Sequence, residues 1–123
     1  MNLSGEAIKR IVDFYDIKDV LIIHDDLDLP LGTIKIKFGG GNGGHNGLKS
    51  IDKCIGDKYT RIRIGITHPR DSSIDVVDYV LGDFDENDFG ILKKVFCVSN
   101  NAIESFINDE KLLDLQNKYN KRV

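Results

Sequence analysis

Two short polar stretches of this 123-residue sequence contain side chains that could perform acid–base chemistry. The first is "HDDLD", residues 24–28, which directly follows the apolar run "DVLII" at 19–23. A carboxylate at the carboxyl end of a buried strand lies where α/β proteins usually bind ligands. Asp25 or Asp26 could therefore orient a histidine as a general base, or contribute to a metal site. Aspartates that cap loops and form turns explain the same pattern without any chemistry.

The second stretch is the glycine-rich segment "GGGNGGHNG" at 39–47. Glycines at this density leave an open backbone whose N–H groups can approach an oxyanion or a phosphate at the start of a helix. His45 and Asn46 occupy that position, and the amide of Asn46 can both donate and accept hydrogen bonds. His45 could equally serve as a helix cap or as a packing residue.

Gly39, Gly41 and Gly44 also satisfy the G-x-G-x-x-G pattern of dinucleotide-binding proteins. The strand before them alternates apolar residues with lysines, however, whereas the first strand of that fold is buried on both faces. No acidic residue ends the next strand, where the chain has Arg61 and Arg63 instead. The match therefore gives little support for a nucleotide site.

Basic side chains alternate with apolar ones in the segments "TIKIKF" and "RIRIGI". Successive side chains of a strand point to opposite faces, so the basic residues of each segment share one face. If the two strands are neighbours, Lys35, Lys37, Arg61 and Arg63 form a basic patch on a protein whose net charge is −3. Such a patch suits the phosphate backbone of a nucleic acid, although an ordinary solvated sheet face explains it as well.

The spacing of apolar residues predicts the elements that position these side chains. Ser4 is a candidate N-cap for an amphipathic helix at 5–16, and 19–23 is a short buried strand, expected to run parallel to its neighbours. The two alternating segments, 33–38 and 61–66, are predicted strands. Between them the sequence predicts a helix with apolar residues on one side, namely Leu48, Ile51 and Ile55.

The C-terminal half is predicted to be mainly helical. Residues 74–81 fit either a strand or a short helix, and apolar spacing predicts a long helix from Glu86 to Ile107. A short final helix should end in a frayed basic tail that contains Lys121 and Arg122. Because helices and strands alternate, the sequence predicts one α/β domain over residues 1–123 with a mixed sheet.

The composition is that of an ordinary globular protein, with 41% hydrophobic and 30% charged residues. A negative net charge argues against nucleic-acid binding through overall charge, but leaves room for a local basic face. Cys54 and Cys97 lie in apolar helical patterns and are expected to be reduced core residues. No apolar run approaches the roughly 18 residues of a membrane span, so we expect no membrane association and a cytoplasmic location.

Longer stretches of the sequence resemble one protein family closely. "HDDLDLPLGTIKIKFGGGNGGHNGLKSI", "YTRIRIGITHP", "VVDYVLGDF" and the opening "MNLSGEAI" are similar to motifs of the bacterial-type peptidyl-tRNA hydrolases. The resemblance implies a single α/β domain with a mixed, mostly parallel central sheet flanked by helices. It also implies a monomeric, cofactor-free and metal-free enzyme that cleaves the ester between a peptide and the terminal ribose of tRNA.

The same resemblance implies roles for individual residues. Asp25 matches the aspartate that hydrogen-bonds the catalytic histidine, while His45 and Asn46 match the pair that lines the cleft. Asn46 would contact the tRNA end and the attacking water, and Asn2 would contact the substrate near the scissile ester. Two further matches, Lys37 and Arg63, correspond to the basic residues that hold tRNA phosphates.

The family's catalytic histidine and first sheet strand lie in an N-terminal segment that precedes the motif matched by "MNLSGEAI". We therefore expect a domain incomplete at its N-terminus, in which none of His24, His45 and His68 occupies the position of the base. A second interpretation is a non-catalytic tRNA-binding or RNA-binding module that keeps the basic face. A third is a small-molecule hydrolase or nucleotide-binding protein that uses the glycine loop.

Overall fold

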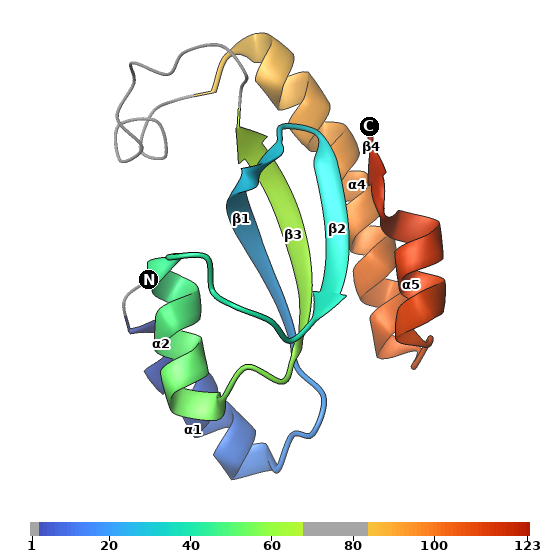
Figure 1. Cartoon of the computed structure of the whole chain (residues 1–123). Coiled ribbons are helices and arrows are strands. Elements are labelled where there is room, and N and C mark those ends of the chain that lie inside the picture. Colours follow the sequence, from blue (N-terminus) through green and yellow to red (C-terminus); the bar gives the residue numbers. More distant parts are fainter. Residues whose placement is uncertain (1–2, 68–83) are drawn as a thin grey trace.

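A computed structural model describes residues 3–67 and 84–123 as an α/β fold (Figure 1). The helices and strands follow the chain in the order α1 (Ser4–Tyr15), β1 (Leu21–Pro30), β2 (Thr33–Phe38), α2 (Asn46–Ile55), β3 (Thr60–Thr67), α4 (Glu86–Ile107), α5 (Leu112–Tyr119) and β4 (Lys121–Arg122). The predicted element at 74–81 lies outside the described residues, as do Asn2 and His68. No described helix has both the length and the apolar character needed to cross a membrane.

The sheet has the strand order β1-β3-β2-β4, and its pairing is mixed as predicted. Strand β1 runs parallel to β3, whereas β2 pairs antiparallel with both β3 and β4. The expectation of a mostly parallel sheet is therefore wrong for the described strands. The reason is the two-residue connection at 31–32, which reverses the chain directly after β1 and makes β2 run the opposite way.

The two faces of the sheet are covered by different helices. The α4 and α5 helices pack on the face that carries Ile34, Ile36 and Ile62, which are at most 2% exposed. On the other face, Leu48 of α2 packs with Tyr59 and with partly buried residues of α1 and β1. In Figure 1, α1 and α2 lie side by side, while α4 passes behind β2 and α5 lies next to α4 on the right. The alternation read from the sequence thus separates an apolar face from a second face that combines apolar and charged residues.

Several predicted element boundaries differ from the structure. Leu3, not Ser4, is the N-cap of α1, and no side chain caps that helix. Strand β1 continues beyond the predicted 19–23 to Pro30, through the acidic stretch, because its backbone pairs with β3. The long helix α4 has the predicted boundaries. It begins with a reciprocal cap in which the side chains of Asp85 and Asp88 accept from each other's backbone N–H groups, at 2.9 and 3.0 Å.

The prediction of a frayed C-terminal tail is also wrong. Lys121 and Arg122 form the short edge strand β4, and Val123 N donates to Gly32 O at 2.9 Å. Just before them, Asn120 Oδ1 accepts from Ile36 N at 2.6 Å. Backbone groups at the open side of β2 recruit this segment, which the charges of the tail did not predict.

The prediction for the cysteines is only partly correct. Both are free thiols, as expected, but Cys97 is exposed on α4 and Cys54 is half-buried on α2. Strand β1 forms one edge of the described sheet, and its Ile23 and Leu27 are 45% and 38% exposed. That the family's first sheet strand lies in an additional N-terminal segment stays a prediction.

Candidate catalytic site

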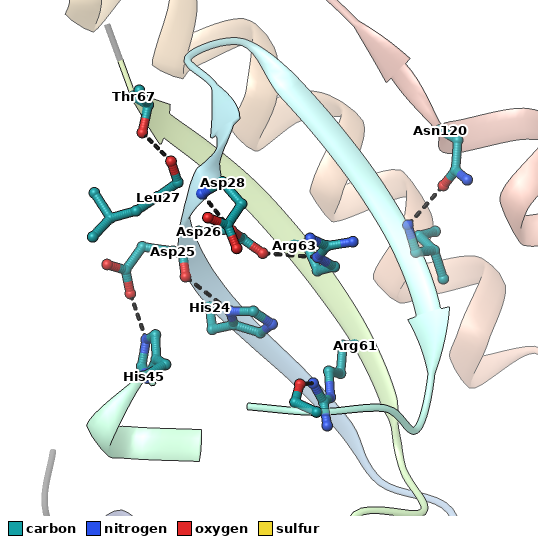
Figure 2. A network of polar contacts seen from close by, with 12 residues as sticks. His24, Asp25, Asp26, Leu27, Asp28, His45, Arg61, Arg63, Thr67 and Asn120 are labelled. Carbon is teal, nitrogen blue, oxygen red and sulfur yellow. Dashed lines mark hydrogen bonds and ion pairs between the residues drawn. The ribbon is translucent and has the colours of Figure 1, made fainter. Parts of the chain in front are cut away.

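A cleft of about 310 Å³ opens where the end of β1, the glycine loop, the start of α2 and one face of β3 meet. Its walls are polar and charged, and the close-up in Figure 2 shows how the strands and α2 direct their side chains toward it. The polar lining residues are His24, Asp25, Asp26, Asp28, Lys37, Asn42, His45, Arg61 and Arg63. Most of the sequence-derived candidates therefore gather in one place.

Asp25 and His45 form the central contact of this cleft. His45 Nε2 lies 2.8 Å from Asp25 Oδ1, and Figure 2 shows the two side chains pointing toward each other. His45 is also the N-cap of α2, since its Nδ1 accepts from Leu48 N at 3.2 Å. A backbone N–H can only donate, so Nδ1 is unprotonated and Nε2–H is the donor to Asp25. Both ring nitrogens of His45 are therefore occupied.

His24 is a second histidine beside this pair, and it is only 8% exposed. Its Nδ1–H donates to the carbonyl oxygen of Asp25 at 2.8 Å, which leaves Nε2 as the unprotonated nitrogen. Nε2 is buried and has no hydrogen-bond partner among the described residues. Burial lowers the pKa of His24, and the His24 and His45 rings meet edge to face with centroids 5.4 Å apart. His24 is thus a neutral group beneath His45, shielded from solvent.

The basic residues of β2 and β3 are neighbours, as the alternation predicted. Lys35 lies opposite Arg63, and Lys37 lies opposite Arg61. They do not form a patch of four free cations, however. Arg63 Nε donates to Asp26 Oδ2 at 2.8 Å, and Arg61 is 2% exposed with its guanidinium turned onto the carbonyl groups of the glycine loop.

The pairing with Arg63 also fixes the charge of Asp26. Burial alone would raise the pKa of Asp26, but hydrogen bonds from Arg63 and from the N–H of Asp28 outweigh it and lower the pKa. The two aspartates in the middle of β1 therefore have different partners, a histidine for Asp25 and an arginine for Asp26. Among residues 3–67 and 84–123, no group of three or more histidine, cysteine or carboxylate side chains converges as a metal site would require.

Asn46 is exposed at the first position of α2, directly beside His45. One residue that the sequence reasoning passed over is Asn42. Its side-chain oxygen accepts from Gly44 N at 3.0 Å and its carbonyl accepts from His45 N at 2.9 Å. These contacts form a turn at residues 42–45, and an asparagine within a run of glycines is the sequence signal that could have indicated it.

A mixed sheet with a histidine–carboxylate pair beside a parallel strand places the chain among α/β proteins with a polar cleft. Because β1 continues to Pro30, the carboxylate of Asp25 lies in the middle of the strand and not at its carboxyl end, as the sequence had predicted. A family model described as peptidyl-tRNA hydrolase matches residues 1–123. The chain therefore belongs to the peptidyl-tRNA hydrolase family, and the resemblance of its motifs is confirmed.

Individual relatives agree with this assignment. The chain is 46% identical over 119 residues to a peptidyl-tRNA hydrolase of Helicobacter pylori (strain P12), with 97% of this chain and 62% of the relative covered. It is 49% identical over 121 residues to that of Rickettsia prowazekii (strain Madrid E), covering 96% of this chain and 64% of the relative. The crystal structure of peptidyl-tRNA hydrolase from Acinetobacter baumannii superposes with a TM-score of 0.87 at 34% identity, covering 99% of this chain and 62% of that one. The chain thus spans about three-fifths of the length of these relatives.

Proposed function

We propose that this domain takes part in hydrolysis of the ester bond between a peptidyl group and tRNA, which recycles peptidyl-tRNA released during translation. The observation that carries the proposal is the 2.8 Å contact between His45 and Asp25 in a cleft that the glycine loop helps to line. Family membership supports the reaction class. The proposal also takes the enzyme to be cytoplasmic and monomeric, with peptidyl-tRNA as its partner.

The proposed roles follow from the position of each group. Asn46, exposed beside His45, contacts the acceptor end of the tRNA and the attacking water. Lys37 contacts a tRNA phosphate, together with the Nη groups of Arg63, whose Nε is already held by Asp26. Asn2, outside the described residues, contacts the substrate near the scissile ester. The open glycine loop gives the nucleotide end room to approach the backbone.

The described histidines are not in a state to act as the general base that activates the water. Nδ1 of His45 is held by the N–H of Leu48, and Nε2 of His24 is shielded from solvent. No histidine nitrogen of the described residues is both unprotonated and exposed to the cleft. For a histidine to activate the water, either His45 must leave its capping position or a histidine outside residues 3–67 and 84–123 must supply the base.

The same observation favours a second candidate function, a tRNA-binding module that does not cleave the ester. In that case Lys37 still contributes to phosphate binding, and Lys37→Ala should reduce the slope of log affinity against log salt by about one unit. Catalysis and binding must therefore be measured separately.

The test is cleavage of an N-blocked aminoacyl-tRNA by the chain and by its Asp25→Ala and Asn46→Ala variants. Matched controls are Asp114→Ala and Asn117→Ala, which remove an exposed carboxylate and an exposed amide from α5. We expect kcat/KM to fall about 100-fold or more in the cleft variants and to stay unchanged in the controls. Binding without cleavage would support the second candidate, and neither binding nor cleavage would refute both.

A further inference from the structure

Arg61 is a buried cation behind the glycine loop. Its side chain comes from β3 and is only 2% exposed. Nη1 donates to Gly41 O at 2.6 Å and Nη2 donates to Gly40 O at 2.7 Å. The guanidinium carbon also lies 5.0 Å from the centre of the Tyr59 ring. Figure 2 shows Arg61 against the backbone of the loop segment that leaves β2.

The charge of Arg61 has no carboxylate partner among the described residues, and this separates it from its neighbour. Arg63, two positions along the same strand, is paired with Asp26. Among the described residues, Arg61 is compensated by two carbonyl dipoles and an aromatic face. Because a buried charge without a counter-charge is costly, a neutral residue would be expected here unless the guanidinium had a specific role.

The geometry of the guanidinium indicates that role. Its planar fork presents two parallel donors, which match the two successive carbonyl groups of Gly40 and Gly41. A lysine ammonium is a point charge and cannot hold both carbonyls in a fixed plane. With φ of +96° at Gly40, the loop adopts a backbone conformation that residues with a side chain rarely adopt. Because glycines restrict the backbone little, contacts from neighbouring residues determine where this loop lies.

Those contacts connect β3 with the pair formed by His45 and Asp25. Beyond Gly41, the side chain and carbonyl of Asn42 bind the N–H groups of Gly44 and His45. On the other side, Tyr59, which faces the Arg61 guanidinium, donates its hydroxyl to Asp52 of α2 at 2.6 Å. The guanidinium is thus fixed to the sheet, to the loop and, through Tyr59, to the helix that begins after His45.

We propose that Arg61 is the positioning residue of this cleft: its guanidinium holds the carbonyl groups of Gly40 and Gly41, and so places the loop that brings His45 to Asp25. Arg61 itself does not touch the substrate. Its effect on catalysis rests on the proposed function, whereas its effect on the loop does not.

The first test is amide hydrogen exchange of the Arg61→Lys variant, which keeps the charge and loses the fork. We expect exchange at Gly44 and His45 to rise about 10- to 100-fold, the equivalent of one charged hydrogen bond, while amides of α4 stay unchanged. The matched control is Lys58→Met, which removes an exposed cation close in sequence and should leave the loop unchanged. Unaltered loop exchange in Arg61→Lys would overturn the proposal.

The second test distinguishes positioning from general stabilisation. The ring nitrogens of His45 should give NMR signals of the Nε2–H form in the wild-type chain, and of a tautomer mixture in Arg61→Lys. If the protein also cleaves peptidyl-tRNA, kcat should fall in this variant with little change in KM. Wild-type His45 signals and an unchanged kcat in Arg61→Lys would overturn the proposal. If the protein does not cleave the ester at all, the amide hydrogen exchange of the loop and the NMR signals of His45 still test whether Arg61 positions the loop.

A third measurement requires no variant and covers the case in which Arg61→Lys does not fold. In the wild-type protein, the Nη groups of Arg61 should give separate, slowly exchanging NMR signals because both are bonded to carbonyls. Averaged Nη signals, like those of an exposed arginine, would overturn the proposal.

Discussion

His45 Nε2 donates to Asp25 Oδ1 at 2.8 Å, while the opposite side of the same ring caps α2. The two residues are 20 positions apart in the sequence and meet because the start of α2 lies beside the middle of β1. One side chain therefore links helix formation to the carboxylate of the cleft. Stability and chemistry at His45 can be separated by substitutions that keep one contact and remove the other.

Replacing His45 with asparagine or with alanine should separate its two roles. Asparagine is a strong N-cap, so His45→Asn should keep the stability of α2, whereas His45→Ala should lose about 1 kcal/mol. Both variants lose the contact with Asp25 and should show the same loss of ester cleavage. Urea unfolding measures the first effect and kcat the second. Equal stability of the two variants would show that the cap contributes nothing.

Alanine should be destabilising at one of two successive glycines of the loop and neutral at the other. At Gly40, where φ is +96°, an added Cβ would lie 2.7 Å from Lys37 Nζ and 2.8 Å from its Cε. At Gly41, whose φ is not positive, an added Cβ meets no atom within 4 Å.

We expect Gly40→Ala to lower the free energy of unfolding by about 1–3 kcal/mol and to weaken tRNA affinity by displacing Lys37. Gly41→Ala should stay within about 0.5 kcal/mol of the wild type. Thermal unfolding and tRNA binding of both variants give the comparison. A neutral Gly40→Ala would mean that the loop relaxes without strain.

The buried His24 should make the protein acid-sensitive. Its folded-state pKa lies below the ordinary value of 6.5, chiefly because of burial, so below that pH the unfolded chain binds more protons than the folded one. The stabilisation is complete above 6.5 and is lost as the pH falls through the folded-state pKa, by up to about 1.4 kcal/mol per pH unit.

His24→Asn removes this titration and keeps an N–H donor for the carbonyl of Asp25. Urea unfolding between roughly pH 7 and pH 5 should therefore show a shallower decline in the variant than in the wild type. His45 and His68 are present in both proteins, so their contributions to the pH dependence of unfolding cancel when the two curves are subtracted. Parallel curves would contradict a neutral, buried His24.

Two helical glycines should respond to alanine in opposite directions. Gly5 of α1 lies against α2, and an added Cβ would be 2.1 Å from Ser50 O, so Gly5→Ala should destabilise the fold by about 1–3 kcal/mol. Gly90 of α4 has no atom within 4 Å of an added Cβ, and Gly90→Ala should stabilise by about 1 kcal/mol. The two melting temperatures should move apart. A stabilising Gly5→Ala would mean that α1 and α2 can separate at little cost.

Local patterns in the sequence were sufficient for much of this structure. The alternation in "TIKIKF" and "RIRIGI" predicted two strands with one apolar and one basic face, because side chains of a strand point to alternate sides. The long helix from Glu86 to Ile107 was predicted at both ends. His45 and Asp25 were both identified as candidates from their positions beside a glycine loop and a buried strand.

Other features depended on contacts that no local pattern records. Insertion of β3 between β1 and β2 put a parallel and an antiparallel pairing side by side, and only that order brings Lys37 opposite Arg61. Arg61 and Arg63 are two residues apart in one alternating segment, yet the first is buried on loop carbonyls and the second is paired with Asp26. The sequence by itself determined which side chains share a face. Tertiary structure decided which charges are free, because a partner for a charge is supplied by whatever backbone or carboxylate folds next to it.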